Sequence, residues 1–210
     1  MNAFRAVSLS AASRTRRVTW LRSPSRIVSP LTSFLLLIGA SAVEAQAAPP
    51  TFEAAIVARL LSADRALPSR AGASLAIGLV FRAAAPSSQN LAALEAYAAL
   101  KAQPIQGLTP TTVGRAFRDL EDLESWVERE GIDLLRIADG FGPEIAEIRR
   151  LCESRRIACV SSDAGYLKQG FALGVVLRDN KPRILVNPAA ARAQGLDLDP
   201  KVLELAEIVR

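Results

Sequence analysis

The 210-residue sequence contains no histidine, only two cysteines and few aromatic residues, which make up 5% of the chain. The lack of histidine excludes Ser-His-Asp and Cys-His catalytic arrangements and any zinc site that uses imidazole. Two cysteines alone cannot complete a structural zinc site with four protein ligands, so we predict no metal site and no cofactor. With so few aromatic residues, the core must consist mainly of Ala, Leu, Val and Ile.

Phosphate-binding loops are also missing, because neither G-x-x-x-x-G-K-[ST] nor G-x-G-x-x-G occurs. The formal net charge of +5 would by itself suggest a nucleic-acid or membrane partner. However, residues 1–47 hold six arginines and a single glutamate, and the rest of the chain has equal numbers of basic and acidic side chains. The basic character belongs to the N-terminal segment, and we expect no nucleic-acid partner.

That N-terminal segment has the three parts of an export signal. Its arginines are followed by an apolar run over 31–43 and then by small residues, with an A-x-A pattern at Ala45 and Ala47. The apolar run is shorter than the roughly 20 residues that cross a bilayer, and Pro49 and Pro50 follow it. We predict a cleaved signal peptide over 1–47, with the cut near Ala45 to Ala48, and one domain over 48–210. An uncleaved anchor is the alternative.

The remaining sequence alternates between apolar runs and amphipathic stretches. We predict helices over 51–66, 87–102, 119–131 and 142–156, and strands over 74–81, 113–117, 132–139 and 157–162. A hairpin over 171–187 and two short helices, opened by Pro188 and Pro200, complete the chain. This alternation predicts an α/β fold: a mainly parallel sheet flanked by helices on both faces, with a C-terminal β-hairpin and short closing helices.

Two predicted loops follow strands and carry polar residues. Asp139 lies in "ADGFG", and "SSDAGYLKQG" contains Ser161, Ser162, Asp163 and Tyr166. Because α/β sheets often bind ligands at the carboxyl edge of their strands, these residues could form a small-ligand site, with Tyr166 covering it. Alternatively, the first loop is a tight turn and Ser-Ser-Asp caps the next one.

Cys152 falls in the last turns of a predicted helix, and Cys159 in the strand that follows. Such a connection can bring the two Cα atoms within the roughly 4.4–6.8 Å that a disulfide requires. In an oxidising compartment this bond would form, and the missing C-x-x-C pattern argues against a redox enzyme. We predict a structural disulfide, with a buried free pair as the alternative.

The C-terminal sequence from Gly165 onward resembles the end of the YfiR family (DUF4154-like). The resemblance lies in an aromatic residue before the hairpin, a glycine within it and an asparagine after it. A "GL" pair and a closing apolar segment follow. Here these places are taken by Phe171, Gly174, Asn187, Gly195, Leu205 and Ala206. A cysteine pair at the position of Cys152 and Cys159 is part of the same resemblance.

The resemblance implies a non-enzymatic periplasmic regulator in cyclic-di-GMP signalling. Such a protein would act as a homodimer and bind the periplasmic part of an inner-membrane signalling protein, for which a diguanylate cyclase is the suspected partner. The alternative from another class is a small-ligand binding domain that resembles one lobe of an ABC-transporter solute receptor. The βα alternation and the two polar loops favour this second hypothesis.

Overall fold

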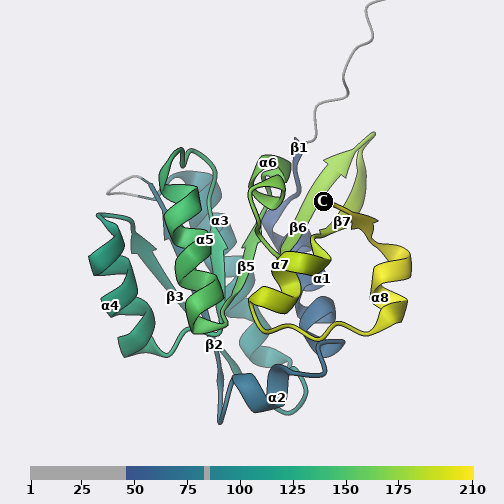
Figure 1. Ribbon diagram of the computed structural model, residues 1–210, viewed down its shortest axis with the longest axis horizontal. Helices are drawn as coiled ribbons and strands as arrows, with labels where there is room; N and C mark the ends of the chain where they lie inside the picture. Colours follow the sequence, from purple (N-terminus) through teal and green to yellow (C-terminus); the bar gives the residue numbers. More distant parts are fainter. Residues whose placement is uncertain (1–45, 83–85) are drawn as a thin grey trace, which may run out of the picture. The chain divides into compact units, whose positions relative to one another are not determined.

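An eight-stranded sheet forms the centre of the computed structural model, which describes residues 46–82 and 86–210 (Figure 1). The strands lie in the order β3-β2-β4-β5-β6-β7-β8, and β1 pairs with β6 outside this path. Their bounds are β1 (Gln46–Ala47), β2 (Leu75–Phe81), β3 (Pro110–Ala116), β4 (Leu134–Ile137), β5 (Ala158–Ser161), β6 (Leu173–Arg178), β7 (Lys181–Val186) and β8 (Glu207–Ile208). The pairs from β3 to β6 are parallel, and β6 and β7 form an antiparallel hairpin.

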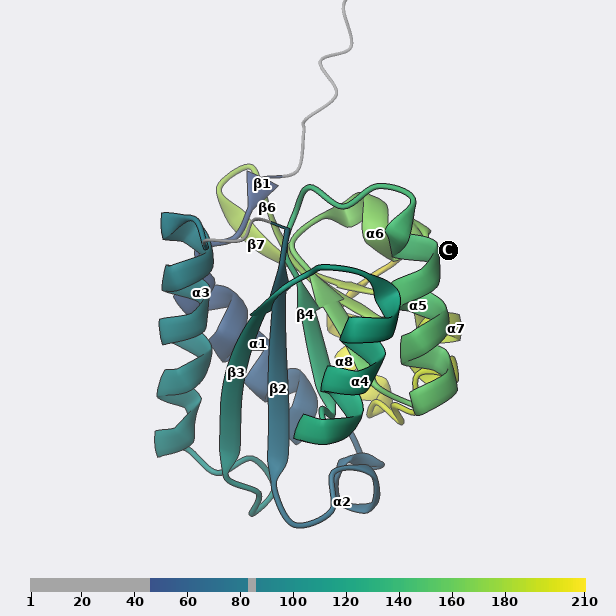
Figure 2. The same cartoon turned by 90° about the vertical axis from the view of Figure 1, so that its left-hand side faces the viewer.

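Helices cover both faces of the sheet. The helices are α1 (Pro50–Ser62), α2 (Leu67–Arg70), α3 (Ser88–Ala98), the 3-10 helix η1 (Ala99–Ala102), α4 (Leu120–Glu130), α5 (Glu144–Arg155), α6 (Ala164–Lys168), α7 (Pro188–Ala193) and α8 (Pro200–Leu205). In Figure 2, α1 and α3 lie on one side of the sheet, and α4 and α5 lie on the other. The predicted fold class is confirmed, including the hairpin and the short closing helices.

Side-chain alternation along β2 explains these two layers. Leu75, Ile77 and Leu79 join the apolar cluster beneath α1 and α3, whereas Ala76 and Val80 join the cluster beneath α4 and α5. Successive strand residues point to opposite faces, so a strand buried on both sides is apolar throughout. Trp126 of α4 is 4% exposed and belongs to the second cluster.

Some element bounds differ from the predicted ones. The strand predicted over 113–117 begins at Pro110, because a proline is tolerated as the first residue of an edge strand. The first helix ends at Ser62 rather than near residue 66, and the short helix α2 follows. The last helix ends at Leu205, after which Glu207 and Ile208 pair with the outer edge of β7.

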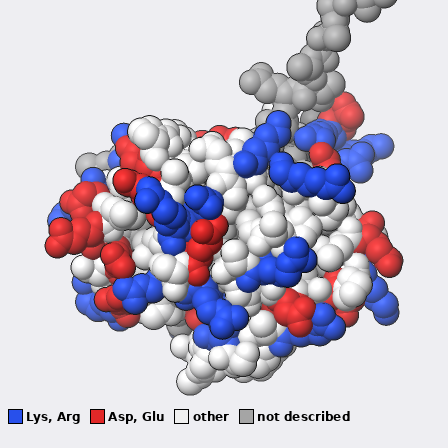
Figure 3. Space-filling view, in the orientation of Figure 1, with Lys and Arg blue, Asp and Glu red and all other residues white. Residues whose placement is uncertain are grey.

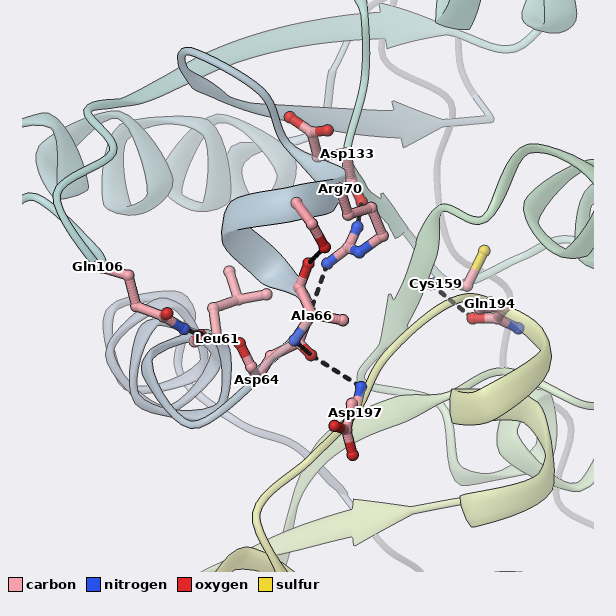
Figure 4. A network of polar contacts seen from close by, with 10 residues as sticks. Leu61, Asp64, Ala66, Arg70, Gln106, Asp133, Cys159, Gln194 and Asp197 are labelled. Carbon is pink, nitrogen blue, oxygen red and sulfur yellow. Dashed lines mark hydrogen bonds and ion pairs between the residues drawn. The ribbon is translucent and has the colours of Figure 1, made fainter.

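A buried carboxylate joins the early and late parts of the chain (Figure 4). Asp64 follows α1, is fully buried, and accepts hydrogen bonds from the backbone N–H groups of Ala66 and Asp197, at 3.1 and 2.8 Å. Its other oxygen accepts from Arg70, which also donates to the carbonyl of Asp133, the residue directly before β4. Asp64 therefore holds the segment after α7 against the turn after α1.

Charges of both signs lie close together on the face seen in Figure 3. Between α4 and α5, Arg155 forms ion pairs with Glu124 and Glu128. Exposed pairs of this kind contribute little stability, because water and salt screen them.

Candidate functional site

The two polar loops identified in the sequence meet at the carboxyl edge of the sheet. Asp139 follows β4, and Ser162 follows β5, which lies beside β4. The Ser162 hydroxyl donates a hydrogen bond to Asp139 Oδ1 at 3.2 Å. The structure therefore brings Asp139 and Ser162 together, as expected for the ends of neighbouring parallel strands.

Ser161 and Asp163 shape the local turn. The Ser161 hydroxyl donates to the Ile137 carbonyl and accepts a bond from the Asp163 N–H, so it lies within the sheet edge. Asp163 is the N-cap of α6 and accepts from the Gly165 N–H at 2.7 Å. For these two residues the geometry is that of the capping interpretation.

Tyr166 is 3% exposed, and its hydroxyl is bound to the loop after β4. It donates to the Phe141 carbonyl at 3.0 Å and accepts from the Phe141 N–H at 2.8 Å. Burial raises the pKa of Tyr166. Both hydrogen bonds fix the position of Phe141, so Tyr166 stabilises the loop after β4.

A buried ion pair lies below this edge. Arg136 of β4 is 4% exposed and donates to both carboxylate oxygens of Glu53, at 3.0 and 3.2 Å. Glu53 lies in the first turn of α1, is fully buried, and also accepts from the Tyr97 hydroxyl at 3.0 Å. Burial opposes the charged guanidinium, but the attraction of Glu53 and the hydrogen bonds with it raise the pKa of Arg136, which stays cationic.

This ion pair is connected to the sheet edge. Arg136 Nη2 lies 3.5 Å from the Ser162 hydroxyl oxygen, and Ser162 in turn binds Asp139. Burial raises the pKa of Asp139, while Arg136 and the Ser162 hydrogen bond oppose this shift. The arrangement holds a partly accessible carboxylate in a fixed position above a rigid, buried ion pair.

The strand order reverses at this place. From β2 the chain crosses to β3 on one side and then to β4 on the other, and ligands in such sheets bind at this switch point. Arg82, directly after β2, has a half-exposed side chain, pairs with Glu144 and lies 5.6 Å above the Phe141 ring. Phe141 in turn makes an edge-to-face contact with Phe117.

The sequence interpretation missed Arg82, Phe141, Arg136 and Glu53. A signal for Arg136 was available, because it is the one charged residue in the apolar segment "LLRIA". A charged side chain in a fully buried strand requires a partner. Glu53 was not identifiable as that partner, since 83 residues separate the two.

The predicted disulfide is present between Cys152 of α5 and Cys159 of β5, with a Cα–Cα distance of 6.4 Å. Both residues are fully buried. The bond joins the end of α5 to the strand that follows it. Cys159 N–H also donates to the side chain of Gln194, at 2.8 Å (Figure 4).

Most of the C-terminal residues that carry the family resemblance contribute to packing, helix capping or turn geometry. Phe171 is fully buried and contacts the ring of Tyr166 edge to face, and Asn187 caps α7 while donating to the Leu167 carbonyl. At Gly174, an added Cβ would lie 2.6 Å from a Leu167 methyl carbon. Gly195 has a φ of 81°, which favours glycine. By contrast, Leu205 is 80% exposed, and Ala206 lies between α8 and β8.

The α/β fold of this chain is shared with several solved structures. A substrate binding protein with adhesive properties from Clostridium difficile aligns with a TM-score of 0.50 over 69% of this chain and 57% of that chain. A conserved domain protein from Vibrio cholerae and an ABC domain in complex with L-Trp from Streptococcus pneumoniae both give 0.55, over 79% and 77% of this chain. All three are 14% identical to it. The chain spans about three fifths of the length of these proteins.

The sequence itself matches the family described as YfiR/HmsC-like (DUF4154) over residues 68–207, and the chain belongs to this family. The family is periplasmic and regulatory rather than catalytic, which supports a periplasmic regulator in general terms. No curated protein gave a significant match. In the part of the chain that the structure describes, no helix has the length and apolar character needed to cross a membrane.

Proposed function

We propose that the protein is exported to the periplasm by its N-terminal signal and regulates an inner-membrane signalling protein, such as a diguanylate cyclase, by binding its periplasmic part. In this proposal it acts without catalysis and as a homodimer. Its export signal lies mostly outside the described residues. The family match over 68–207 carries the proposal, because it extends from α2 to β8 and includes nearly the whole domain.

The test is capture of the partner in the native cell. The full chain, tagged in the exposed Asp179–Asn180 turn between β6 and β7, would be expressed from its own locus, crosslinked in intact cells and isolated with membrane proteins. We expect one inner-membrane protein with a cytoplasmic output domain to be enriched, and deletion of the gene to change cellular cyclic-di-GMP. A tagged, exported protein of unrelated fold is the control. Unchanged cyclic-di-GMP together with no membrane partner would refute the proposal.

A second candidate function is binding of a small ligand at the switch point. Arg82 and Asp139 have opposite charges and flank the ends of the neighbouring strands β2 and β4, without pairing with each other among the described contacts. Phe141 lies beside them with its backbone fixed by Tyr166. Such an arrangement suits a small zwitterion, such as a free amino acid, with its carboxylate on Arg82 and its ammonium on Asp139. The neighbour solved with L-Trp supports this class of ligand.

A thermal-shift screen of the exported protein with the free amino acids, sugars and small anions tests this second function. We expect an amino acid to raise the melting temperature, and Arg82→Gln or Asp139→Asn to abolish that rise. Arg59→Gln, an exposed arginine on α1, is the matched control and should keep it. A rise that survives both site variants would refute the site, whatever the result of the partner capture.

A further inference from the structure

Strand β3 lies at one edge of the sheet and has an open side. It comes first in the strand order and pairs only with β2 among the described strands. The Phe117 N–H donates to the Phe81 carbonyl of β2 at 2.8 Å, so the odd-numbered residues of this segment direct their backbone groups toward β2. Neighbouring residues of a strand direct theirs to opposite sides. Thr112, Gly114 and Ala116 therefore present N–H and carbonyl groups that no described strand uses.

Residues that discourage strand pairing protect the opposite edge of the sheet but not β3. Lys181, Pro182 and Arg183 are exposed in the part of β7 that extends beyond its pairing with β8. Lysine, proline and other charged residues at such places hinder the addition of another strand. In β3, the proline is the first residue, and the only charged side chain, Arg115, donates to Asp122 of α4 at 2.9 Å. The remaining β3 edge is regular and uncharged.

The helices α3 and α4 flank this edge (Figure 2), and the side of α3 nearest to it is apolar. Leu94 packs over β3 at Gly114, where an added Cβ would lie 2.5 Å from a Leu94 methyl carbon. Leu91 and Ala98 are the neighbours of Leu94 at helical spacing, so they lie on the same side of α3. Both are exposed, and Leu91, at 48%, is among the few exposed large apolar side chains of the described chain. Covering this side of α3 would bury apolar surface, which is favourable.

The side of α4 nearest to the edge carries charges of opposite sign. Asp122 lies on this side, because it binds Arg115 of β3. Ser125 and Arg129 follow at helical spacing on the same side, and both are exposed. Arg129 also contacts the neighbouring Glu130 at 3.3 Å, an exposed pair that contributes little. If two α4 helices lie side by side in opposite directions around Ser125, Arg129 of each lies next to Asp122 of the other. The charges of this surface are therefore self-complementary.

We propose that a second copy of this chain pairs with the open edge of β3, antiparallel and around a two-fold axis at Gly114. Thr112 of each copy then exchanges backbone hydrogen bonds with Ala116 of the other, and Arg115 lies opposite Val113, so no like charges meet. Each α3 and each α4 lies beside its own counterpart, because a two-fold axis repeats the same surface on both copies. The inference rests on the homodimer of the proposed function and specifies its interface.

Sedimentation equilibrium of the purified native protein tests this interface. We expect a dimer whose dissociation constant rises about tenfold or more in Leu91→Glu and in Arg129→Glu. The first variant places a charge in an apolar contact, and the second places two carboxylates side by side. Leu205→Glu and Arg150→Glu, which change exposed residues of α8 and α5, are the matched controls and should keep the parent value. A melting temperature near that of the parent shows that each variant folds. A monomeric parent protein, or a dimer that neither site variant weakens, would overturn the proposal.

A crosslinking experiment locates the axis. Ser125→Cys places a thiol on α4 beside its counterpart in the second copy, so a short bismaleimide reagent should join the two copies. Ser69→Cys, at an exposed position of α2, should remain uncrosslinked. A dimer that is crosslinked through Ser69→Cys and not through Ser125→Cys would overturn the interface and leave the homodimer of the proposed function standing.

Amide hydrogen exchange, followed by NMR, reports on the edge itself. In the parent dimer the amides of Thr112, Gly114 and Ala116 should exchange slowly, and in Leu91→Glu they should exchange about tenfold faster or more. Slow exchange only in the presence of a captured membrane protein would assign the edge to that partner and overturn the proposal. Partner capture itself can succeed or fail with either result, so the two proposals are tested separately.

Discussion

At the scale of single residues, the Glu53–Arg136 ion pair is a feature of the core in which each buried charge requires the other. Both side chains are at least 96% buried, and Tyr97 supplies a further hydrogen bond to the carboxylate. A buried pair of this kind adds little net stability, but either partner alone is strongly unfavourable. The pair therefore fixes the position of α1 on β4 by penalising any arrangement that separates the two charges.

Replacing one partner should expose this penalty. Glu53→Ala leaves the Arg136 guanidinium buried without its counter-charge, and we expect a loss of about 3–5 kcal/mol in the free energy of unfolding by urea. Glu95→Ala, an exposed glutamate on α3, should cost no more than about 0.5 kcal/mol. In the double variant Glu53→Leu/Arg136→Met, much of the loss should be recovered. Equal effects of Glu53→Ala and Glu95→Ala would show that the pair is not buried as described.

Asp139 provides a pH-dependent test of the sheet edge. Burial raises the pKa of Asp139 above its ordinary value of 3.8, so the folded state disfavours its charged form. Its contribution to stability is present below the ordinary pKa and is lost as the pH rises through the folded-state pKa. We therefore expect Asp139→Asn to raise the melting temperature at pH 7 and to have little effect below the ordinary pKa.

The control for this change is Asp179→Asn in the exposed turn between β6 and β7. Melting curves of the two variants and the parent protein, recorded between pH 3 and pH 7, give the comparison. A lower melting temperature for Asp139→Asn at pH 7 would mean that its hydrogen bond with Ser162 outweighs the cost of burial.

At the scale of elements, two interactions fix the connection between α5 and β5. The disulfide joins Cys152 to Cys159, and the Ile157 N–H donates to the Cys152 carbonyl at 2.9 Å where the helix ends. The loop closed by the disulfide is short, with a sequence separation of 7. Its main contribution is to limit the freedom of this segment in the unfolded chain.

Reduction should therefore lower stability without changing the fold. We expect dithiothreitol to reduce the free energy of unfolding by about 2–3 kcal/mol, measured by urea titration. The Cys152→Ala/Cys159→Ala variant should start from a lower stability and show no response to the reductant. If the parent protein were equally insensitive, with two free thiols by titration before reduction, the disulfide would be absent from the native protein.

Comparison with the structure shows which elements the local sequence can predict and which depend on partners far away in the chain. The apolar run at β2 and the caps and glycine around α4 are local, and both elements were predicted to within a few residues. Strands β1 and β8 have two residues each and form because β6 and β7 offer free edges. The candidate site shows the same contrast between local and distant determinants. The loops with Asp139 and Ser162 follow predicted strands, so the sequence indicated them, whereas Arg82 and Glu53 acquire their roles through partners far away in the chain.

At the scale of the whole molecule, Asp64 connects the start of the domain with its last quarter. It accepts three hydrogen bonds, one of them from the N–H of Asp197. Asp197 also pairs with Arg65, but both side chains of that pair are more than half exposed. The buried contact, rather than the exposed ion pair, should therefore hold the C-terminal segment.

A matched pair of variants separates the two contacts. Asp64→Ala leaves Arg70 Nη2 and two backbone N–H groups without their acceptor, and we expect a loss of about 3–5 kcal/mol in the free energy of unfolding. Asp197→Ala removes only the exposed ion pair and should cost about 0–1 kcal/mol. Hydrogen exchange of residues 196–209 should rise in Asp64→Ala and stay near the parent value in Asp197→Ala. Equal protection in both variants would contradict the role given to Asp64.

If the chain is exported unfolded, in line with the proposed function, the link from Asp64 to Asp197 must form late. The two residues are 133 positions apart, so a chain that crosses the membrane unfolded cannot join them until nearly all of it has emerged. Cys159 emerges much earlier and can meet Cys152 at once, since their loop is short. In a pulse-labelled translocation intermediate, oxidation of the two thiols should therefore precede resistance to protease. The export machinery would then release a chain whose only covalent crosslink is already made while its sheet is still incomplete.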